Sequence, residues 1–149
     1  MWREFELARW DGDPPGCPRC GATGRCRLLP SAPGARRVWR CGACRDQFSV
    51  LAGTLLERSR ASLAVWAAVV SDVAAGPVGA RELARRHAIT PETARLLRGR
   101  VTAAGVRPGA DPAAALRALL RLPADEVARV RRAVPARRQP VHGPTRDYA

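Results

Sequence analysis

Four of the five cysteines form two Cys-x-x-Cys pairs, a spacing that is typical of a metal site. Two residues separate Cys17 from Cys20 and Cys41 from Cys44, and 20 residues lie between the pairs. Each pair can place two thiolate sulfurs on one ion, and zinc takes four ligands at the corners of a tetrahedron. Because four thiolates leave no coordination position open, the site would be structural rather than catalytic. The sequence therefore predicts one structural Zn²⁺, with iron or an iron–sulfur cluster as the alternative for the same ligands.

A β-hairpin is expected to bring the two cysteine pairs together. β-like runs at 25–29 and 37–40 flank a loop that contains proline and glycine. Gly21 and Gly42 give the two metal-binding turns conformational freedom. The fifth cysteine, Cys26, is predicted to be a small half-buried residue of the first strand and not a ligand. A redox pair is the other interpretation of Cys-x-x-Cys, but neither pair lies on a strand–helix unit. A ribbon of this size depends on metal for much of its folding free energy.

From residue 62 the apolar residues recur every three or four positions, which predicts helices. The first helix is expected over 62–74 and the second over 80–87. A third helix is expected to begin at residues 90–91, because threonine is a good N-cap and proline is favoured at the first helical position. Three helices in this order predict a trihelical helix-turn-helix unit.

The third helix carries the candidate DNA contacts. Its 3.6-residue period turns Ala94, Leu97 and Val101 inward, so residues near its N-terminus, and Gly99 further along, face outward. In such a unit this helix enters the major groove, where Arg95 could fork onto a guanine edge. The predicted contacts are Thr90, Glu92, Thr93, Arg95, Arg98 and Arg100. Arg98 and Arg100 would hold phosphates from the flanks of the helix. The alternative is an ordinary three-helix module with a solvated charged face.

The remainder of the chain predicts two more helices and a tail. One helix is expected to begin at Asp111-Pro112 and the other at Pro123, and the chain loses its periodicity from Pro135. The predicted fold is a small α+β protein: a zinc ribbon followed by a helix-turn-helix and C-terminal helices. The ribbon with its N-terminal lead-in is expected over 1–54 and the helix-turn-helix over 55–105. A C-terminal helical segment should follow over 106–135 and a disordered tail over 136–149.

The chain is strongly basic. It has 26 basic residues, all of them arginine, and 13 acidic residues, which give a net charge of +13. A chain of this charge is attracted to polyanions, and nucleic acid is the default partner. A GC-rich coding sequence also favours arginine, so part of this charge carries no functional information. The longest apolar stretch, 61–70, is too short to span a bilayer, and the N-terminus lacks the apolar run of a signal peptide. We therefore expect a cytoplasmic, nucleoid-associated protein with no membrane partner.

Four motifs between residues 9 and 66 carry a family resemblance. They are Arg9-Trp10-Asp-Gly, Cys17-Pro-Arg-Cys20-Gly, Val38-Trp39-Arg-Cys41-Gly-Ala-Cys44-Arg-Asp-Gln-Phe48-Ser-Val-Leu-Ala-Gly-Thr54 and Leu63-Ala-Val-Trp66. This arrangement resembles the N-terminal region of the ISXO-like bacterial insertion-sequence transposases, over residues 9–101. In that family a zinc ribbon precedes a helix-turn-helix and an RNase H-like DDE catalytic domain. The resemblance implies that the four cysteines bind zinc and that the helical part contacts transposon-end DNA. It also implies that Phe48 and the Gly53-Thr54 turn join the ribbon to the helices.

The chain departs from that family in two respects. Arg95 and Arg98 stand where relatives carry aromatic or apolar residues, and no catalytic domain is expected. The acidic residues after Arg100, none in a strand-like context, are Asp111, Asp125, Glu126 and Asp147. The sequence therefore predicts a DNA-binding protein without enzymatic activity, similar to the DNA-recognition part of a transposase and surviving as a truncated relic or a regulator.

Three alternatives remain at the level of sequence. The chain could be the DNA-binding subunit of a transposase whose catalytic chain is encoded separately. Its ribbon could instead bind protein, or the gene could be decaying and its product without function. No oligomeric state follows from the sequence.

Overall fold

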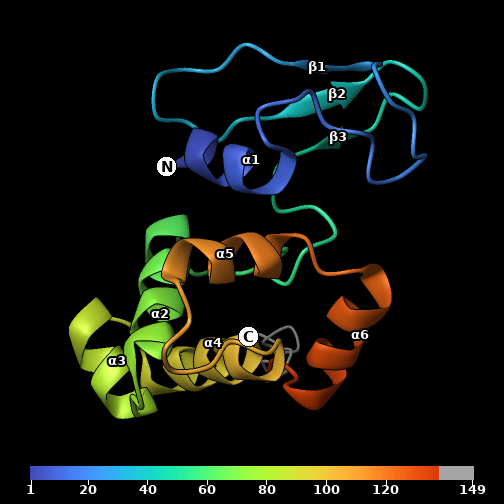
Figure 1. Ribbon diagram of the computed structural model, residues 1–149. Helices are drawn as coiled ribbons and strands as arrows, with labels where there is room; N and C mark the ends of the chain where they lie inside the picture. The colour runs from blue at the N-terminus through green and yellow to red at the C-terminus, as the bar shows by residue number, and fades with distance from the viewer. Residues whose placement is uncertain (138–149) are drawn as a thin grey trace, which may run out of the picture.

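The computed structural model describes residues 1–137, which form a small α+β fold, as predicted (Figure 1). This part of the chain contains six helices and one three-stranded antiparallel sheet. In chain order the elements are α1 (Trp2–Trp10), β1 (Cys26–Leu28), β2 (Trp39–Cys41), β3 (Gln47–Phe48), α2 (Leu63–Ala75), α3 (Ala80–His87), α4 (Pro91–Ala103), α5 (Pro112–Leu120) and α6 (Ala124–Ala133). None of these helices combines the length and apolar character that crossing a membrane requires. The predicted disordered tail lies, from residue 138 onward, outside the described residues.

The predicted hairpin forms, and a third strand extends it. β1 pairs antiparallel with β2, so that Cys26 lies opposite Cys41. β2 pairs in turn with β3, with Trp39 opposite Phe48. The prediction missed β3 because two residues are too few to show a period of two. Strand pairing with β2, which is a tertiary contact, defines this strand.

Residues 2–10, expected only as a lead-in to the ribbon, form helix α1. Phe5 is 1% exposed and packs into the core of the helical part, while Trp10 contacts both that core and the ribbon. The Trp10 ring lies edge-on to Trp39, with centroids 6.1 Å apart. The segment gives no local start signal, because Met1 makes no side-chain cap hydrogen bond. Tertiary packing therefore stabilises this helix, which lies between the sheet and α5 in Figure 1.

The helical part forms around α2, which packs against α3, α4 and α5. Trp66, Val70 and Val73 of α2 are buried, as their spacing predicted. Three of these helices begin at a side-chain cap: the Ser62 hydroxyl accepts the amide of Val65 at 3.2 Å. Thr90 before α4 and Asp111 before α5 likewise accept an amide of the first turn, whereas α3 and α6 begin without such a cap. These caps satisfy amides that have no partner within the helix.

The segment between β3 and α2 belongs to both halves of the molecule. Phe48 is buried in the small core of the ribbon, whereas Val50, Leu55 and Leu56 are buried in the core of the helical part. Thr54 is buried too, and its hydroxyl donates to the Leu51 carbonyl at 2.7 Å. The buried residues of this segment therefore connect the ribbon to α2.

Candidate metal centre and nucleic-acid interface

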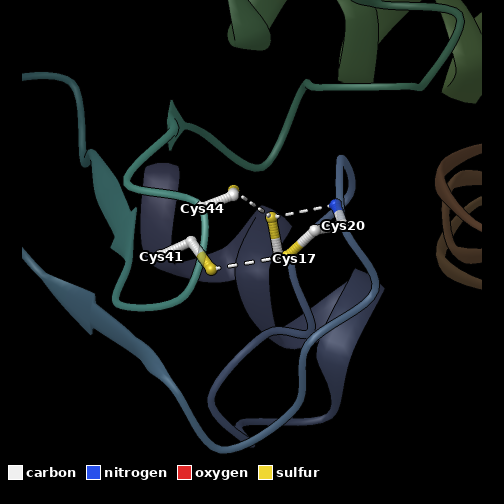
Figure 2. A group of neighbouring side chains, drawn as sticks. All are labelled: Cys17, Cys20, Cys41 and Cys44. Carbon is white, nitrogen blue, oxygen red and sulfur yellow. Dashed lines mark hydrogen bonds between the residues drawn. The ribbon is translucent and has the colours of Figure 1, made fainter.

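The two cysteine pairs converge on one point (Figure 2). The sulfur atoms of Cys17, Cys20, Cys41 and Cys44 all lie within 4.8 Å of one another. Across the pairs, the sulfurs of Cys17 and Cys44 are 3.6 Å apart, and those of Cys20 and Cys41 are 3.7 Å apart. A tetrahedron with metal–sulfur bonds of about 2.3 Å has edges of about 3.8 Å. The geometry therefore fits tetrahedral coordination of one zinc ion.

Each pair is part of a tight turn whose backbone faces the sulfurs. The amide of Cys20 donates to the Cys17 sulfur at 3.5 Å, and the amide of Ala43 donates to the Cys41 sulfur at 3.3 Å. The residue after each second cysteine has a left-handed backbone. This residue is Gly21 in the first turn, at φ 75°, and Arg45 in the second, at φ 63°. The predicted freedom at Gly21 is therefore used, and Arg45 adopts the same conformation at the cost of its Cβ.

Gly42 has a different role from the one predicted. Its backbone is not in the left-handed region. Its amide donates to the Arg25 carbonyl at 2.8 Å, and a Cβ at this position would lie 3.1 Å from that oxygen. Glycine is therefore favoured here because the β1 end of the hairpin approaches closely, and not because the turn needs conformational freedom.

Backbone amides, burial and the neighbouring thiols shift the pKa values of three of the four clustered cysteines. The backbone amide of Cys44 and then that of Ala43 lower the pKa of Cys41 to about 6, against the effect of burial. The amide of Cys20 is the largest cause of the lowered pKa of Cys17. The amide of Asp46 acts to lower the pKa of Cys44, but burial and the neighbouring thiols raise it to about 12. Four thiolates this close together need a cation to remain ionised, and a divalent metal meets that need.

Cys26 lies beside the site without belonging to it. It is half-buried, as predicted, and its sulfur is not among the four that cluster. Burial, followed by the charge of Cys41, raises its pKa to about 11, so it is a neutral thiol. The donor set is thus four thiolates with no open position, and the protein binds one structural Zn²⁺ through Cys17, Cys20, Cys41 and Cys44.

The predicted outward face of α4 is present in part, because Gly99, which was expected on it, is half-buried. Ala94, Leu97 and Val101 are fully buried, as the helical period required. Glu92, Arg95 and Arg98 are exposed. Whether these three side chains touch DNA is not tested by the fold, so their role stays a prediction.

The two predicted threonine contacts already serve as a cap. The Thr90 hydroxyl accepts the Thr93 amide at 3.1 Å, and the two hydroxyl oxygens lie 2.9 Å apart. Thr90 is exposed and Thr93 is half-buried. Both side chains therefore stabilise the start of α4, and any contact they make with DNA would be additional to that role.

Arg100 does not lie on an exposed flank, and that prediction was wrong. It is only 9% exposed, and its Nε donates to the Val134 carbonyl at 3.3 Å. Gly99, expected to face outward, also lies against Val134: a Cβ there would be 2.9 Å from Val134 Cγ1. The cause is the end of α6, which covers this side of α4. A helical period within α4 could not reveal a contact between residues 34 positions apart.

Several positioning residues had no clear signal in the sequence. Glu6 is 6% exposed and accepts from Arg37 Nε at 2.8 Å and from Trp39 Nε1 at 2.9 Å, which ties α1 to the ribbon. His87 is half-buried, and its Nε2 lies 2.7 Å from Asp72 Oδ2. A lone acidic residue between apolar neighbours is a weak hint of such a buried partner, but only the fold identifies which groups it meets.

Comparison with known proteins bears on the ribbon. Residues 3–47 match a family model described as the transposase zinc-ribbon domain. The chain matches no curated protein and no solved structure. The resemblance stated from the motifs is thus confirmed for the zinc-ribbon part. On the evidence of four converging thiolates and this match, the N-terminal part of the chain is similar to the zinc ribbon of transposases.

Proposed function

We propose that the chain binds duplex DNA, with α3 and α4 acting as a helix-turn-helix and α4 entering the major groove. The observation that carries the proposal is a pair of exposed arginines on α4 that no acidic side chain in the described part of the chain neutralises. Arg85 and Arg86 on α3 pair with Glu82, at 2.6 and 2.7 Å. Within residues 1–137, neither Arg95 nor Arg98 of α4 makes a side-chain ion pair or hydrogen bond. Two unneutralised arginines on one exposed face provide donors for bases and phosphates.

The ribbon and the overall charge support the same proposal. The N-terminal residues are similar to a domain of transposases, which act on DNA, and the net charge is +13. The capped start of α4 places Glu92 and Arg95 in its first turns, the part of such a helix that reaches base edges. We propose that Arg95 reads a base and that Arg98 holds a phosphate.

The proposed biological role is that of a regulator, or a relic, similar to the DNA-recognition part of a transposase. The rival role is that of a DNA-binding subunit that acts with a separate catalytic chain. Within residues 1–137, the cluster suited to a metal consists of the four cysteines, with no carboxylate among them. We therefore expect the purified protein not to cleave or join transposon ends with Mg²⁺ or Mn²⁺. Metal-dependent cleavage that is absent from a mock preparation would overturn this part of the proposal.

The binding test begins by selecting a preferred duplex from a random library with the zinc-loaded protein. Affinity for that duplex should fall as salt rises. A plot of log K against log salt concentration should have a slope of about −0.9 per phosphate contact, or about −4 to −5 for four to six contacts. Arg95→Ala should weaken the selected duplex by about 1–3 kcal/mol and relax base preference. Arg85→Ala is the matched control, since that arginine is exposed but paired with Glu82. If no duplex binds even at low salt, the ribbon's interaction with protein becomes the better explanation.

A further inference from the structure

A pocket lined by arginines lies between the segment before α2, the side of α4 that carries Thr93 and Arg100, and the end of α6. Its volume is about 300 Å³. The charged side chains that line it are Glu57, Arg58, Arg60, Arg100 and Arg131, so its lining carries a net charge of +3. Thr93, in the first turn of α4, lies on the same wall. We call this the Arg100–Arg131 pocket.

Arg100 is a buried cation that has no carboxylate partner among residues 1–137. Its side chain is among the most buried polar groups, with 9% of the residue exposed, and its single hydrogen bond within residues 1–137 goes to a backbone carbonyl. Burial lowers its pKa, and the positive charge of Arg131 lowers it further. Buried charges in proteins are normally paired or hydrogen-bonded throughout. In the described part of the chain, no anionic side chain is hydrogen-bonded to Arg100.

Arg131 is held in place from one side and is unsatisfied on the other. Its Nη2 donates to the carbonyl of Thr54 at 2.8 Å. Its Nε is buried and has no acceptor within the described residues. A carboxylate oxygen of Glu57 is 3.9 Å from Nη2, and both side chains are more than a third exposed, so this pair is weak. A buried N–H without an acceptor is unfavourable, so this side of the guanidinium is left unsatisfied.

The backbone that contributes Arg58 to the pocket is held in an unusual conformation. Arg58 is a non-glycine residue at φ 59°, in the left-handed region that L-residues rarely adopt. The turn is held by Ser59, whose hydroxyl accepts from Trp66 Nε1 at 2.9 Å and from the amide of Ala61 at 3.2 Å. The segment that contributes Arg58 to the pocket is thereby anchored to the buried tryptophan of α2.

We propose that the Arg100–Arg131 pocket binds a phosphate group. Guanidinium groups present paired N–H donors that match the oxygens of a phosphate, and two of them around one cavity favour a tetrahedral oxyanion. The pocket shares α4 with the proposed DNA-reading face, so the phosphate of a DNA backbone is one source and free phosphate is the other. The choice of DNA as the source rests on the proposed function; the binding of phosphate itself does not.

The first arm of the test uses inorganic phosphate. Phosphate should raise the Tm of the zinc-loaded protein above its value in chloride of equal ionic strength, and the effect should saturate. Arg100→Met and Arg131→Gln should each weaken this effect about tenfold or more, which corresponds to 1.4 kcal/mol or more. Arg132→Gln, next to Arg131 on α6 but exposed and outside the pocket, should keep it. In phosphate-free buffer Arg100→Met should fold and be at least as stable as the wild type, because it removes a buried unpaired charge.

The second arm separates the two sources. If the ligand is a DNA backbone phosphate, Arg100→Met should weaken every duplex alike and reduce the salt slope by about one, and free phosphate should compete. If the ligand is free phosphate, duplex affinity should be unchanged by Arg100→Met. A saturable phosphate effect in a protein that binds no duplex would reject the proposed function and keep this pocket. A phosphate effect that is absent, or that is equal in all variants as expected from general salt exclusion, would overturn the proposal.

Discussion

The ribbon and the helical part are stabilised in opposite ways. Within residues 1–137 the helical core contains 21 buried apolar residues, whereas the ribbon core contains three: Cys17, Cys41 and Phe48. Two of these three are zinc ligands. Burial of apolar surface stabilises the first part, and so small a cluster cannot hold a three-stranded sheet without metal. We therefore expect the ribbon to depend on metal and the helical part to fold without it, with α1 and the segment at 49–62 joining the two.

Loss of the zinc site should have the largest effect, and this effect should be confined to the ribbon. Cys41→Ser removes a fully buried ligand, so the ribbon should lose its metal and unfold while the helices remain. The effect is large because structural zinc contributes about 10–16 kcal/mol of apparent binding free energy in small domains. Elemental analysis should give one zinc per wild-type chain and none for the variant, and the helical circular dichroism signal should be largely kept.

Cys26→Ser is the matched control for this change. Its sulfur lies outside the cluster, so the variant should keep both the metal and the fold. Equal metal loss in the two variants, or a wild type without metal, would contradict the assignment of ligands.

A cavity in the helical core should destabilise the helical part and leave the zinc site of the ribbon intact. Leu97 is 1% exposed in the core around α2, so Leu97→Ala should destabilise the helical part by about 2–5 kcal/mol. Thermal unfolding followed at 222 nm measures this change. Zinc content should stay at one per chain at temperatures where the variant is folded. Leu96→Ala, at a half-buried position, should cost less, and equal costs would mean that the inward face of α4 is wrong.

The coupling between the two parts should depend on Glu6. Glu6→Ala leaves the donors of Arg37 and Trp39 without their acceptor, at a cost of about 1–3 kcal/mol. We expect faster hydrogen exchange in β2, with zinc retained and the helical part little changed. Glu6→Gln should be milder, since an amide oxygen can still accept from Trp39. Unchanged exchange in Glu6→Ala would mean that the contacts of Trp10 with Trp39 and Phe48 are enough to hold the ribbon against α1.

The smallest effect should come from the two metal-binding turns. Gly21 and Arg45 occupy equivalent left-handed positions, and a Cβ at Gly21 would touch nothing within 4 Å. Gly21→Ala should therefore cost about 1 kcal/mol through backbone strain alone, and Arg45→Gly should relieve a similar strain in the second turn. Resistance to a zinc chelator measures both. The same direction of change in the two variants would show that the turns are not equivalent.

The sequence by itself determined the features that depend on near neighbours. The spacing of the cysteines named the four ligands, because each pair lies in one turn and zinc accepts only a limited geometry. Ser62, Thr90 and Asp111 marked helix starts, because a cap acts within three residues. The period of α4 identified its inward face in the same way.

Helix α1, the burial of Arg100 and the partners of Glu6 depend on residues far away in the sequence, so they appear only in the tertiary structure. Residues 2–10 became a helix because Phe5 enters a core built from segments beyond residue 49. Arg100 became buried because the end of α6 packs across α4 and offers it the Val134 carbonyl. The carboxylate of Glu6 found its partners 31 and 33 residues away. Local patterns encode local geometry, whereas burial and pairing across such separations exist only once the whole chain has packed.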